Sequence, residues 1–585
     1  GVTTPHGGRI DTRYCVMCHN EQRAIGRTAS TSTGGAFTGS TYVTDGEVLG
    51  DFAPMIHKIH MGNRLTKTGY NYAGVLFNEV GYPQDITNCR KCHKLSTAAP
   101  QGDNWKNKPT KEACVACHDT INITTGAGHS GGTTAWSTTC ATCHPSGDID
   151  SLYHVTDNAT PNNPSVPAGA ANFTYEISSV TVGTGADLNK PIVKFRILKD
   201  NTPVVFNTFT GTTDAQKRTF VQSGLLTGFT GSPSFLVAYA SAQDGVAASS
   251  MIDFTNTGKV AAQPASVSIA ELFTTDGGSI TGPDSSGYYI ATLNQQVTRN
   301  SSGVITATVD GKFAANSRRR NVGLQGYFTQ VSPAVARHTV AAVGAVSGEA
   351  RRVVVDSAKC GKCHEWFEGH GGNRVYEIQI CTLCHVPNLS TSGRGANVAN
   401  LNAANAAALT DDGYNAADPS TWPEASNNLK DMIHGIHAGS MREEAGNPYR
   451  FVRDRGTSGV FYYDWSHVVF PGLLNKCEMC HKPGTYGETP NNALATTNET
   501  LGAGTVAQNR ASLPNATDRV TTPLAATCIS CHGYGTNTTA AHMTANGAAT
   551  ANNILRSALP GVTQCVLCHT NHKIAAPAVV HDEVE

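Results

Sequence analysis

Alternation of apolar and polar residues marks the middle of the chain as β-structure. Residues 173–182 (FTYEISSVTV) and 191–197 (PIVKFRI) alternate with a period of two, the pattern of a strand that buries one face. Further stretches rich in β-branched and aromatic residues, separated by Gly, Asn, Asp or Ser, follow at 235–240, 287–293, 304–309 and 322–328. Several short strands with turn residues between them predict a β-sandwich or Greek-key barrel, which we place at residues 156–345.

A helical pattern occurs twice outside that stretch. Residues 51–62 read DFAPMIHKIHMG and residues 429–440 read LKDMIHGIHAGS, so both contain Met-Ile-His-x-Ile-His. Histidines at i and i+3 project from nearly the same face of a helix. A helix lying between two metal centres would therefore offer one histidine to each. The alternative is a core helix with two hydrogen-bonded histidines, and the repetition of the motif within one chain counts against it.

All 18 cysteines lie in nine Cys-x-x-Cys-His pentads. This pentad is typical of covalent c-type haem attachment, in which two thiols bond the porphyrin and the histidine becomes an axial ligand. One pentad alone would be compatible with chance or with half of a zinc site, but nine that use every cysteine favour haem. The cysteines are Cys15, Cys18, Cys89, Cys92, Cys114, Cys117, Cys140, Cys143, Cys360, Cys363, Cys381, Cys384, Cys477, Cys480, Cys528, Cys531, Cys565 and Cys568. The proximal ligands are His19, His93, His118, His144, His364, His385, His481, His532 and His569.

The pentads divide the rest of the chain into two haem domains. We place them at residues 1–155, with four pentads, and 346–585, with five. Only 39% of the residues are hydrophobic, and outside the strand-rich stretch about 400 residues serve nine haems, roughly 44 each, too few to build separate cores. The haems must supply much of the apolar interior, so we expect loops and short helices around them. The middle domain, without a haem motif, is interpreted as a spacer or docking module.

Repeated histidines identify candidates for the second axial ligand. Each copy has a histidine in a Gly-Gly turn before a pentad, the helical pair, one ten or eleven residues after a pentad histidine, and one after its last pentad. The expected distal ligands are His6, His57, His60, His129, His154, His370, His434, His437, His542 and His581. His572 competes with His581 for the last site, and His338 and His467 have no counterpart in the other copy. Because only eight methionines exist, we expect bis-histidine, low-spin, relatively low-potential haems.

The first copy has five candidate distal histidines for four pentads. Cys360 lies 21 residues before Cys381, so a matching pentad in the first copy would begin just upstream of Gly1. One hypothesis is that the chain is the C-terminal part of a ten-haem protein. The rivals are a genuine nine-haem protein and a surplus histidine donated to a neighbouring subunit.

Charge and targeting signals constrain the surroundings of the protein. The 43 basic and 44 acidic residues balance, which predicts no nucleic-acid partner. No apolar run approaches the ~20 residues of a membrane helix, and the N-terminus shows no cysteine for a lipid anchor. Because c-type haem is attached outside the bacterial cytoplasm, we expect an extracellular or cell-surface protein.

These features together resemble the OmcA/MtrC family of outer-surface decahaem cytochromes. The resemblance is carried by the two pentad repeats, the Met-Ile-His-x-Ile-His pair, the His-Gly-Gly turn and the run Val353-Val-Val-Asp356. It implies β-domains alternating with multihaem domains and a continuous electron path through close-packed haems. It also implies transfer to iron or manganese oxides, soluble metals, flavins, electrodes or other cytochromes, and attachment to an outer-membrane conduit. The chain departs from the family in lacking a first β-domain, a first pentad and a lipidation cysteine.

Three functions are therefore weighed. The leading one is extracellular electron transfer by outer-sphere steps, with no discrete substrate site. The second is a subunit of a polymeric cytochrome filament, in which a terminal histidine such as His6 ligates a haem of the next copy. The third is a multihaem reductase of a small oxyanion, which would need an iron with an open face.

Overall fold

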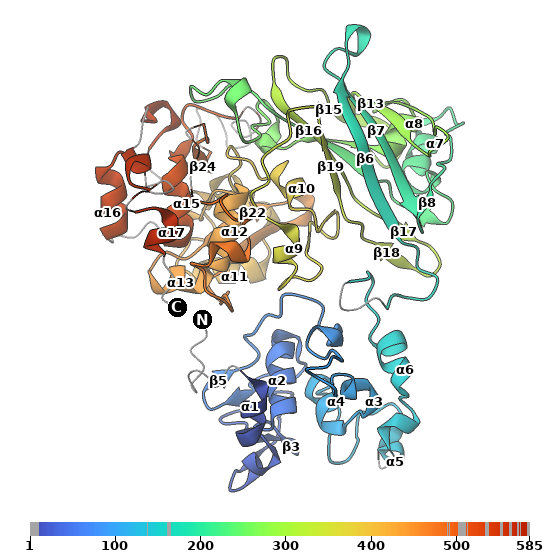
Figure 1. The fold of residues 1–585 in the computed structure, drawn as a ribbon, viewed down its shortest axis with the longest axis vertical. Coiled ribbons are helices and arrows are strands. Elements are labelled where there is room, and N and C mark those ends of the chain that lie inside the picture. The colour runs from blue at the N-terminus through green and yellow to red at the C-terminus, as the bar shows by residue number, and fades with distance from the viewer. Residues whose placement is uncertain are drawn as a thin grey trace. The chain divides into compact units, whose positions relative to one another are not determined.

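The computed structural model describes residues 11–581 apart from 137–138, 161–164, 488–489, 491, 501–510, 512, 533–537, 550–553, 561–563, 570–572 and 574 (Figure 1). Its contacts divide the chain into two units. The first contains Gly1–Ala170 and the short segment Cys363–Trp366, and the second contains Ala171–Lys362 and Phe367–Glu585. The strand-rich stretch therefore groups with the second set of pentads, and the boundaries predicted at 155 and 345 stay predictions.

The first unit has short helices joined by long loops. They are α1 (Thr12–Cys18), α2 (Phe52–Met61), α3 (Asn104–Asn107), α4 (Lys111–Cys117), α5 (Gly132–Ala135) and α6 (Ser146–Asp148). The strands are only two residues long: β1 (Ala29–Ser30), β2 (Val43–Thr44), β3 (Glu47–Val48), β4 (Asn71–Tyr72) and β5 (Val75–Leu76). A small cluster of buried side chains forms its core: Phe37, Leu49, Leu65, Tyr70 and Phe77. A core this small agrees with the expectation that bound haem contributes apolar surface.

Helix α2 contains the first Met-Ile-His-x-Ile-His motif and has defined ends. The Asp51 carboxylate accepts the Phe52 backbone N–H, which caps the helix start. The helix stops at Gly62, whose φ of 47° lies in the left-handed region. A Cβ at that position would lie 2.0 Å from the Val80 carbonyl oxygen, so no larger residue fits there. The predicted helix is therefore present and positioned at both ends.

The second unit begins with two antiparallel sheets. One has the order β11-β10-β16-β19, and the other has the order β12-β13-β7-β6 with β8 paired to β7. The bounds are β6 (Phe173–Val182), β7 (Pro191–Lys199), β8 (Thr202–Pro203), β10 (Ser234–Ala240), β11 (Ala265–Ser268), β12 (Gly278–Thr281), β13 (Tyr289–Leu293), β16 (Arg318–Gln325) and β19 (Ala342–Ala345). Smaller pairings join β14 (Gln295–Arg299) to β15 (Ile305–Asp310), and β17 (Phe328–Gln330) to β9 (Phe229–Thr230) and β18 (Val335–Arg337). Each of the six predicted strand stretches overlaps an observed strand.

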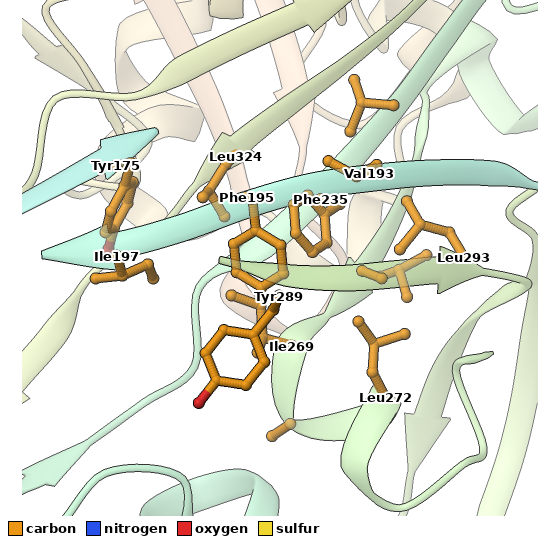
Figure 2. Close-up of a cluster of buried hydrophobic side chains, with 14 of the residues drawn as sticks. Tyr175, Val193, Phe195, Ile197, Phe235, Ile269, Leu272, Tyr289, Leu293 and Leu324 are labelled. Atoms are coloured by element: carbon orange, nitrogen blue, oxygen red, sulfur yellow. The ribbon is translucent and has the colours of Figure 1, made fainter. Parts of the chain in front are cut away.

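The two sheets pack face to face on an aromatic core (Figure 2). Phe195 from β7 meets Phe235 from β10 edge to face, with ring centroids 4.9 Å apart. Both side chains are fully buried, and Tyr289 and Leu324 extend the cluster along the interface. This interdigitation of two inner faces is the packing of a β-sandwich.

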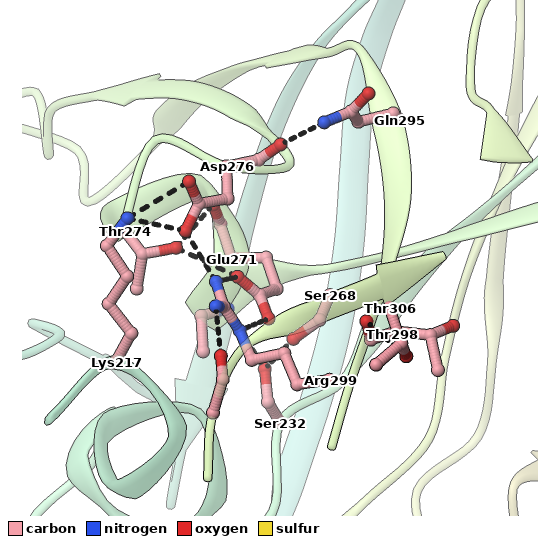
Figure 3. Close-up of polar contacts among 12 residues, drawn as sticks. Lys217, Ser232, Ser268, Glu271, Thr274, Asp276, Gln295, Thr298, Arg299 and Thr306 are labelled. Carbon is pink, nitrogen blue, oxygen red and sulfur yellow. Dashed lines mark hydrogen bonds and ion pairs between the residues drawn. The ribbon is translucent and has the colours of Figure 1, made fainter. Parts of the chain in front are cut away.

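A buried ion network ties the edge of the sandwich to its helix α8 (Ile269–Phe273) (Figure 3). The Arg299 guanidinium, from the end of β14, donates to both oxygens of Glu271, each at 2.8 Å. Asp276 accepts from the same guanidinium and from Lys217 of helix α7 (Asp214–Thr219). Arg299 and Asp276 therefore hold the hairpin, α8 and α7 together.

The outer face of the first sheet packs against the attachment segment of Cys381. Ile380 and Leu383, in and beside helix α10 (Ile378–Thr382), lie with Leu236 and Ala238 of β10 in one buried cluster. The approach is close: a Cβ on Gly323 of β16 would lie 2.3 Å from Ile380 Cδ1. The β-domain therefore contributes directly to the surroundings of this haem site, beyond the predicted role of spacer or docking module.

The remaining elements of the second unit are short. The helices are α9 (Ser357–Cys360), α11 (Ala403–Asp411), α12 (Leu429–His437), α13 (Gly439–Glu444), α15 (Pro523–His532), α16 (Thr538–Ala545) and α17 (Pro577–Val580). Hairpins pair β20 (Glu368–Gly369) with β21 (Arg374–Val375), β22 (Arg450–Asp454) with β23 (Val460–Asp464), and β24 (Thr496–Glu499) with β25 (Arg519–Thr521). Within the described residues, none of the helices has the length and apolar character needed to span a membrane.

Candidate haem sites

The attachment segments are short turns or the ends of helices. In seven pentads the backbone N–H of the histidine donates to the carbonyl of the first cysteine at 2.8–3.0 Å. The histidines that do so are His19, His93, His118, His144, His385, His481 and His569. One short turn therefore carries the two thiols and the imidazole that would bond one porphyrin edge and its iron.

Seven pentad histidines face a second histidine. The ring centroids of these pairs are 5.9–6.3 Å apart. The pairs are His57 with His93, His118 with His154, His129 with His144, His370 with His385, His434 with His481, His532 with His581, and His542 with His569.

This spacing fits a six-coordinate haem iron. By analogy with zinc–histidine bonds, an iron–nitrogen bond is about 2 Å, and about 1 Å more separates each nitrogen from its ring centre, giving about 6 Å in total. The spacing leaves room for one iron atom between the two rings, and it recurs in seven pairs that each include a pentad histidine. The residues therefore fit c-type haem, which supplies one-electron redox chemistry when bound.

The two histidines of each helical pair lie in different environments. On α2, His57 faces His93, whereas the ring of His60 meets Tyr82 edge to face at 5.3 Å. On α12, the corresponding rings behave in the same way: His434 faces His481, and His437 meets Phe470 at 5.6 Å. The two copies thus place equivalent histidines in equivalent surroundings.

The last two pentads of each copy exchange their partner histidines. His154, which follows the last pentad of the first copy, faces His118, and His129, which follows His118 in sequence, faces His144. The second copy repeats this crossing, because His581 faces His532 and His542 faces His569. Spacing along the chain suggests neighbours for these histidines but does not reveal the exchange.

The family comparison matches the same two parts of the chain. A model of the outer membrane cytochrome MtrC/MtrF-like family, domains II/IV, matches residues 2–155 and 352–582. Together these stretches contain every pentad and exclude the β-domain. The chain belongs to this family. The resemblance drawn from the repeated histidine helix and the pentads is therefore confirmed.

Individual relatives agree with this assignment. The multiheme cytochrome MtrC of Shewanella baltica (strain OS185) is 24% identical over 143 residues, which are 23% of this chain and 18% of that relative. Among solved structures, the outer membrane decaheme cytochrome OmcA matches with a TM-score of 0.50 and 16% identity. That match covers 99% of this chain and 72% of OmcA, and it is a likeness of fold. The chain is therefore an MtrC/MtrF-like multihaem c-type cytochrome with β-structure.

Backbone carbonyls orient many of the candidate ligands in this MtrC/MtrF-like chain. A ring Nδ1 that donates to a carbonyl leaves Nε2 free for a metal. Nδ1 lies 2.7–2.8 Å from a carbonyl oxygen in five rings: His60 with Ile56, His154 with Ile149, His385 with Asn427, His437 with Ile433, and His569 with Ala575. The acceptors Ile56 and Ile433 lie one helical turn before their histidines. The sequence does not identify the other acceptors, because the folding of loops brings them to the imidazole rings.

Burial keeps several of these imidazoles neutral. It lowers the pKa of His57, His370, His385 and His434 to about 4. A neutral ring retains the lone pair that binds iron. These histidines are therefore ready to coordinate at neutral pH without first losing a proton.

The other expected ligands are placed less completely. His6 and the competing His572 lie outside the described residues. His19 has its Nδ1 3.2 Å from the Gly50 carbonyl oxygen, and His364 lies in the segment that groups with the first unit. His338, which has no counterpart in the first copy, packs against Gly372 in the turn of His370, and its Nδ1 lies 2.8 Å from Glu368 Oε2.

Proposed function

We propose that this chain conducts electrons at the outer cell surface through nine bis-histidine c-type haems. The observation that carries the proposal is the repeated spacing of about 6 Å between seven pairs of histidine rings. A strong ligand on each face of the iron leaves no open coordination position for a small substrate. Such sites exchange electrons with little change in ligation, which suits a conduit better than a reductase. The distal ligands we propose are drawn from the ten histidines expected from the sequence, one more than nine haems need.

Contacts between pentads support a continuous path in the first unit. Burial raises the pKa of the Cys89 thiol to about 11, and the neighbouring Cys117 thiol raises it further. In the same way, burial and then the Cys140 thiol raise the pKa of Cys114. Because these sulfurs bond the porphyrin edges, neighbouring thiols bring porphyrin edges together. We therefore propose the order Cys89, Cys114, Cys140 for successive haems.

The second unit supports the same order. The neighbouring Cys480 thiol raises the pKa of Cys360, so the two sulfurs lie close together. Backbone pairing also joins these two pentads, because the Asp356 N–H donates to the Cys480 carbonyl at 3.1 Å. Further thiol neighbours are Cys477 with Cys531 and Cys528 with Cys565. We propose a chain through the pentads that begin at Cys360, Cys477, Cys528 and Cys565, with Cys381 held against the β-domain.

Exposed attachment groups favour exchange with large acceptors. Cys18, Cys92, Cys114, Cys143 and Cys568 are exposed, so porphyrin edges bonded there would lie close to solvent. Outer-sphere transfer requires only such an edge near the acceptor. We propose iron and manganese oxides, soluble metals and flavins as acceptors, with other multihaem cytochromes or an outer-membrane conduit as electron donors.

Electron paramagnetic resonance of the oxidised protein, quantified against total haem, tests the proposal. We expect nine haems per chain and essentially all iron low-spin. If about one haem in nine is high-spin, one face is open and an enzymatic reduction becomes the better interpretation. A second measurement mixes the reduced protein with ferric oxide or flavin and follows reoxidation of the haem bands. Failure to reoxidise with any of them would contradict the proposed acceptors.

A further inference from the structure

A fully buried lysine lies between the two ligands of helix α2. Lys58, between His57 and His60, has an exposed fraction of 0%. Its Nζ donates to the carbonyls of Ala116 at 3.2 Å and Val115 at 3.4 Å. Both carbonyls belong to the pentad that begins at Cys114, in the last turn of α4. The last carbonyls of a helix have no N–H partner within it and form its negative end, so a cation is stabilised there.

The ammonium group has two further partners. The Glu47 carboxylate, 4% exposed, lies 2.9 Å from Nζ, and the ring of Tyr70 lies beneath Nζ with its centroid 4.7 Å away. Cation–π attraction of this kind strengthens when the groups are desolvated. Burying one charge without a partner would be costly, so the carboxylate and the ring explain how a lysine is retained in this interior.

The second copy places a different cation in the same surroundings. Position 58 corresponds to Gly435 in α12, which has no charge to offer. Instead Arg442 of α13, 5% exposed, donates from Nη1 to the Ser530 carbonyl at 3.4 Å. Ser530 occupies the same pentad position as Ala116, two residues before the histidine. The charge has therefore been supplied from the next helix.

The aromatic partner is also equivalent. The Arg442 guanidinium lies 5.1 Å from the ring centroid of Tyr449. Tyr449 immediately precedes the β22–β23 hairpin, just as Tyr70 immediately precedes the β4–β5 hairpin. Two residues at different sequence positions thus reach an equivalent carbonyl beside an equivalent tyrosine, which coincidence does not readily produce.

The two cations also lie beside equivalent cysteines. Lys58 donates to the carbonyl of Ala116, which immediately precedes Cys117, and Arg442 donates to the carbonyl of Ser530, which immediately precedes Cys531. Each cysteine is the second of its pentad, so each cation lies near the same edge of the haem that would be bonded there.

We propose that Lys58 and Arg442 are equivalent positioning cations that set the midpoint potentials of the haems bound at Cys114/Cys117 and Cys528/Cys531. A nearby buried positive charge disfavours the ferric state, which carries one more positive charge than the ferrous state, and so raises the potential. In the first copy the Glu47 carboxylate offsets part of that effect. This inference rests on the proposed electron-transfer function, because it assumes haem at both pentads.

Spectroelectrochemical titration of the nine-haem protein tests this with charge changes of opposite sign. Arg442→Met removes a cation, so about one-ninth of the haem absorbance change should titrate at a lower midpoint potential. Arg442→Lys keeps the charge and should leave that potential near the wild-type value. Glu47→Gln leaves Lys58 unneutralised and should raise one potential. The double variant Glu47→Gln/Lys58→Met removes both charges and should return that potential towards wild type. Lys108→Met, which removes an exposed cation from the same unit, is the matched control and should change nothing.

Haem content and low-spin signal are measured on every variant. Nine low-spin haems with unshifted potentials would overturn this inference while leaving the proposed function intact. Shifts of the same sign in Glu47→Gln and Arg442→Met would also overturn it, because a merely structural disturbance does not follow the sign of charge. Loss of low-spin iron in the unmodified protein would instead overturn the proposed function.

Discussion

Replacement of His434 by alanine should open one haem face and leave the others unchanged. The His434 ring lies 6.1 Å from the His481 ring, and its Nδ1 lies 3.2 Å from Ser530 Oγ. Alanine at this position cannot reach an iron held by His481. Because the chain has nine pentads, one haem in nine, about 11% of the iron, should become high-spin.

The assay is electron paramagnetic resonance of the oxidised variant, integrated against total haem. His57→Ala in the first copy should have the same effect through His93, whose ring lies 5.9 Å away. His467→Ala is the matched control, because this exposed histidine has no counterpart in the first copy and its loss should leave the high-spin fraction unchanged. An unchanged high-spin fraction in His434→Ala would refute the ligand assignment. A high-spin fraction far above one-ninth would instead show that α12 supports several sites at once.

Three further predictions concern the β-domain. Phe235→Ala should cost about 3–5 kcal/mol of unfolding free energy, since it removes a fully buried ring. Urea unfolding followed by circular dichroism measures this loss. The control Val205→Ala changes an exposed side chain and should leave the unfolding free energy unchanged. Gly323→Val should displace α10, because even a Cβ at this position would lie 2.3 Å from Ile380 Cδ1. Mass spectrometry should then find chains with one haem fewer. The control Gly147→Ala has open space around its Cβ and should keep all haems. Arg299→Met should cost about 3–5 kcal/mol of unfolding free energy, because it leaves buried carboxylates unpaired. The double variant Arg299→Met/Glu271→Met should recover much of that loss in the same urea assay. Equal losses in the single and double variants would contradict the ion-pair explanation.

Local patterns made much of the architecture predictable. The alternation at 173–182 coincides with β6, and the Met-Ile-His-x-Ile-His motifs lie on α2 and α12. These features depend on residues close together in sequence, where period and spacing determine which side chains share a face.

Long-range contacts were not predictable in the same way. The exchange of His154 and His129 between neighbouring pentads depends on how loops of the first unit fold back. The packing of Gly323 against Ile380 joins a strand to a pentad more than 50 residues away in sequence. Nothing in the local sequence of either partner specifies such a contact, because it arises only when the two surfaces are brought together.

The two copies of the repeat show which property is retained at the haem sites of Cys114 and Cys528. At Gly435 a Cβ would lie 2.9 Å from the Tyr449 ring, so the aromatic side chain fills the space that the stem of Lys58 needs in the first copy. Gly435→Lys should therefore disturb α12 instead of restoring a cation at Ser530. In the first copy, Lys58 of helix α2 supplies the charge, and the Tyr70 ring lies beneath its ammonium group. In the second copy, Tyr449 packs on helix α12, and Arg442 of the next helix supplies the charge. The residue and its position differ, but a buried cation at the pentad carbonyls is present in both, as expected if the charge itself is what the site requires.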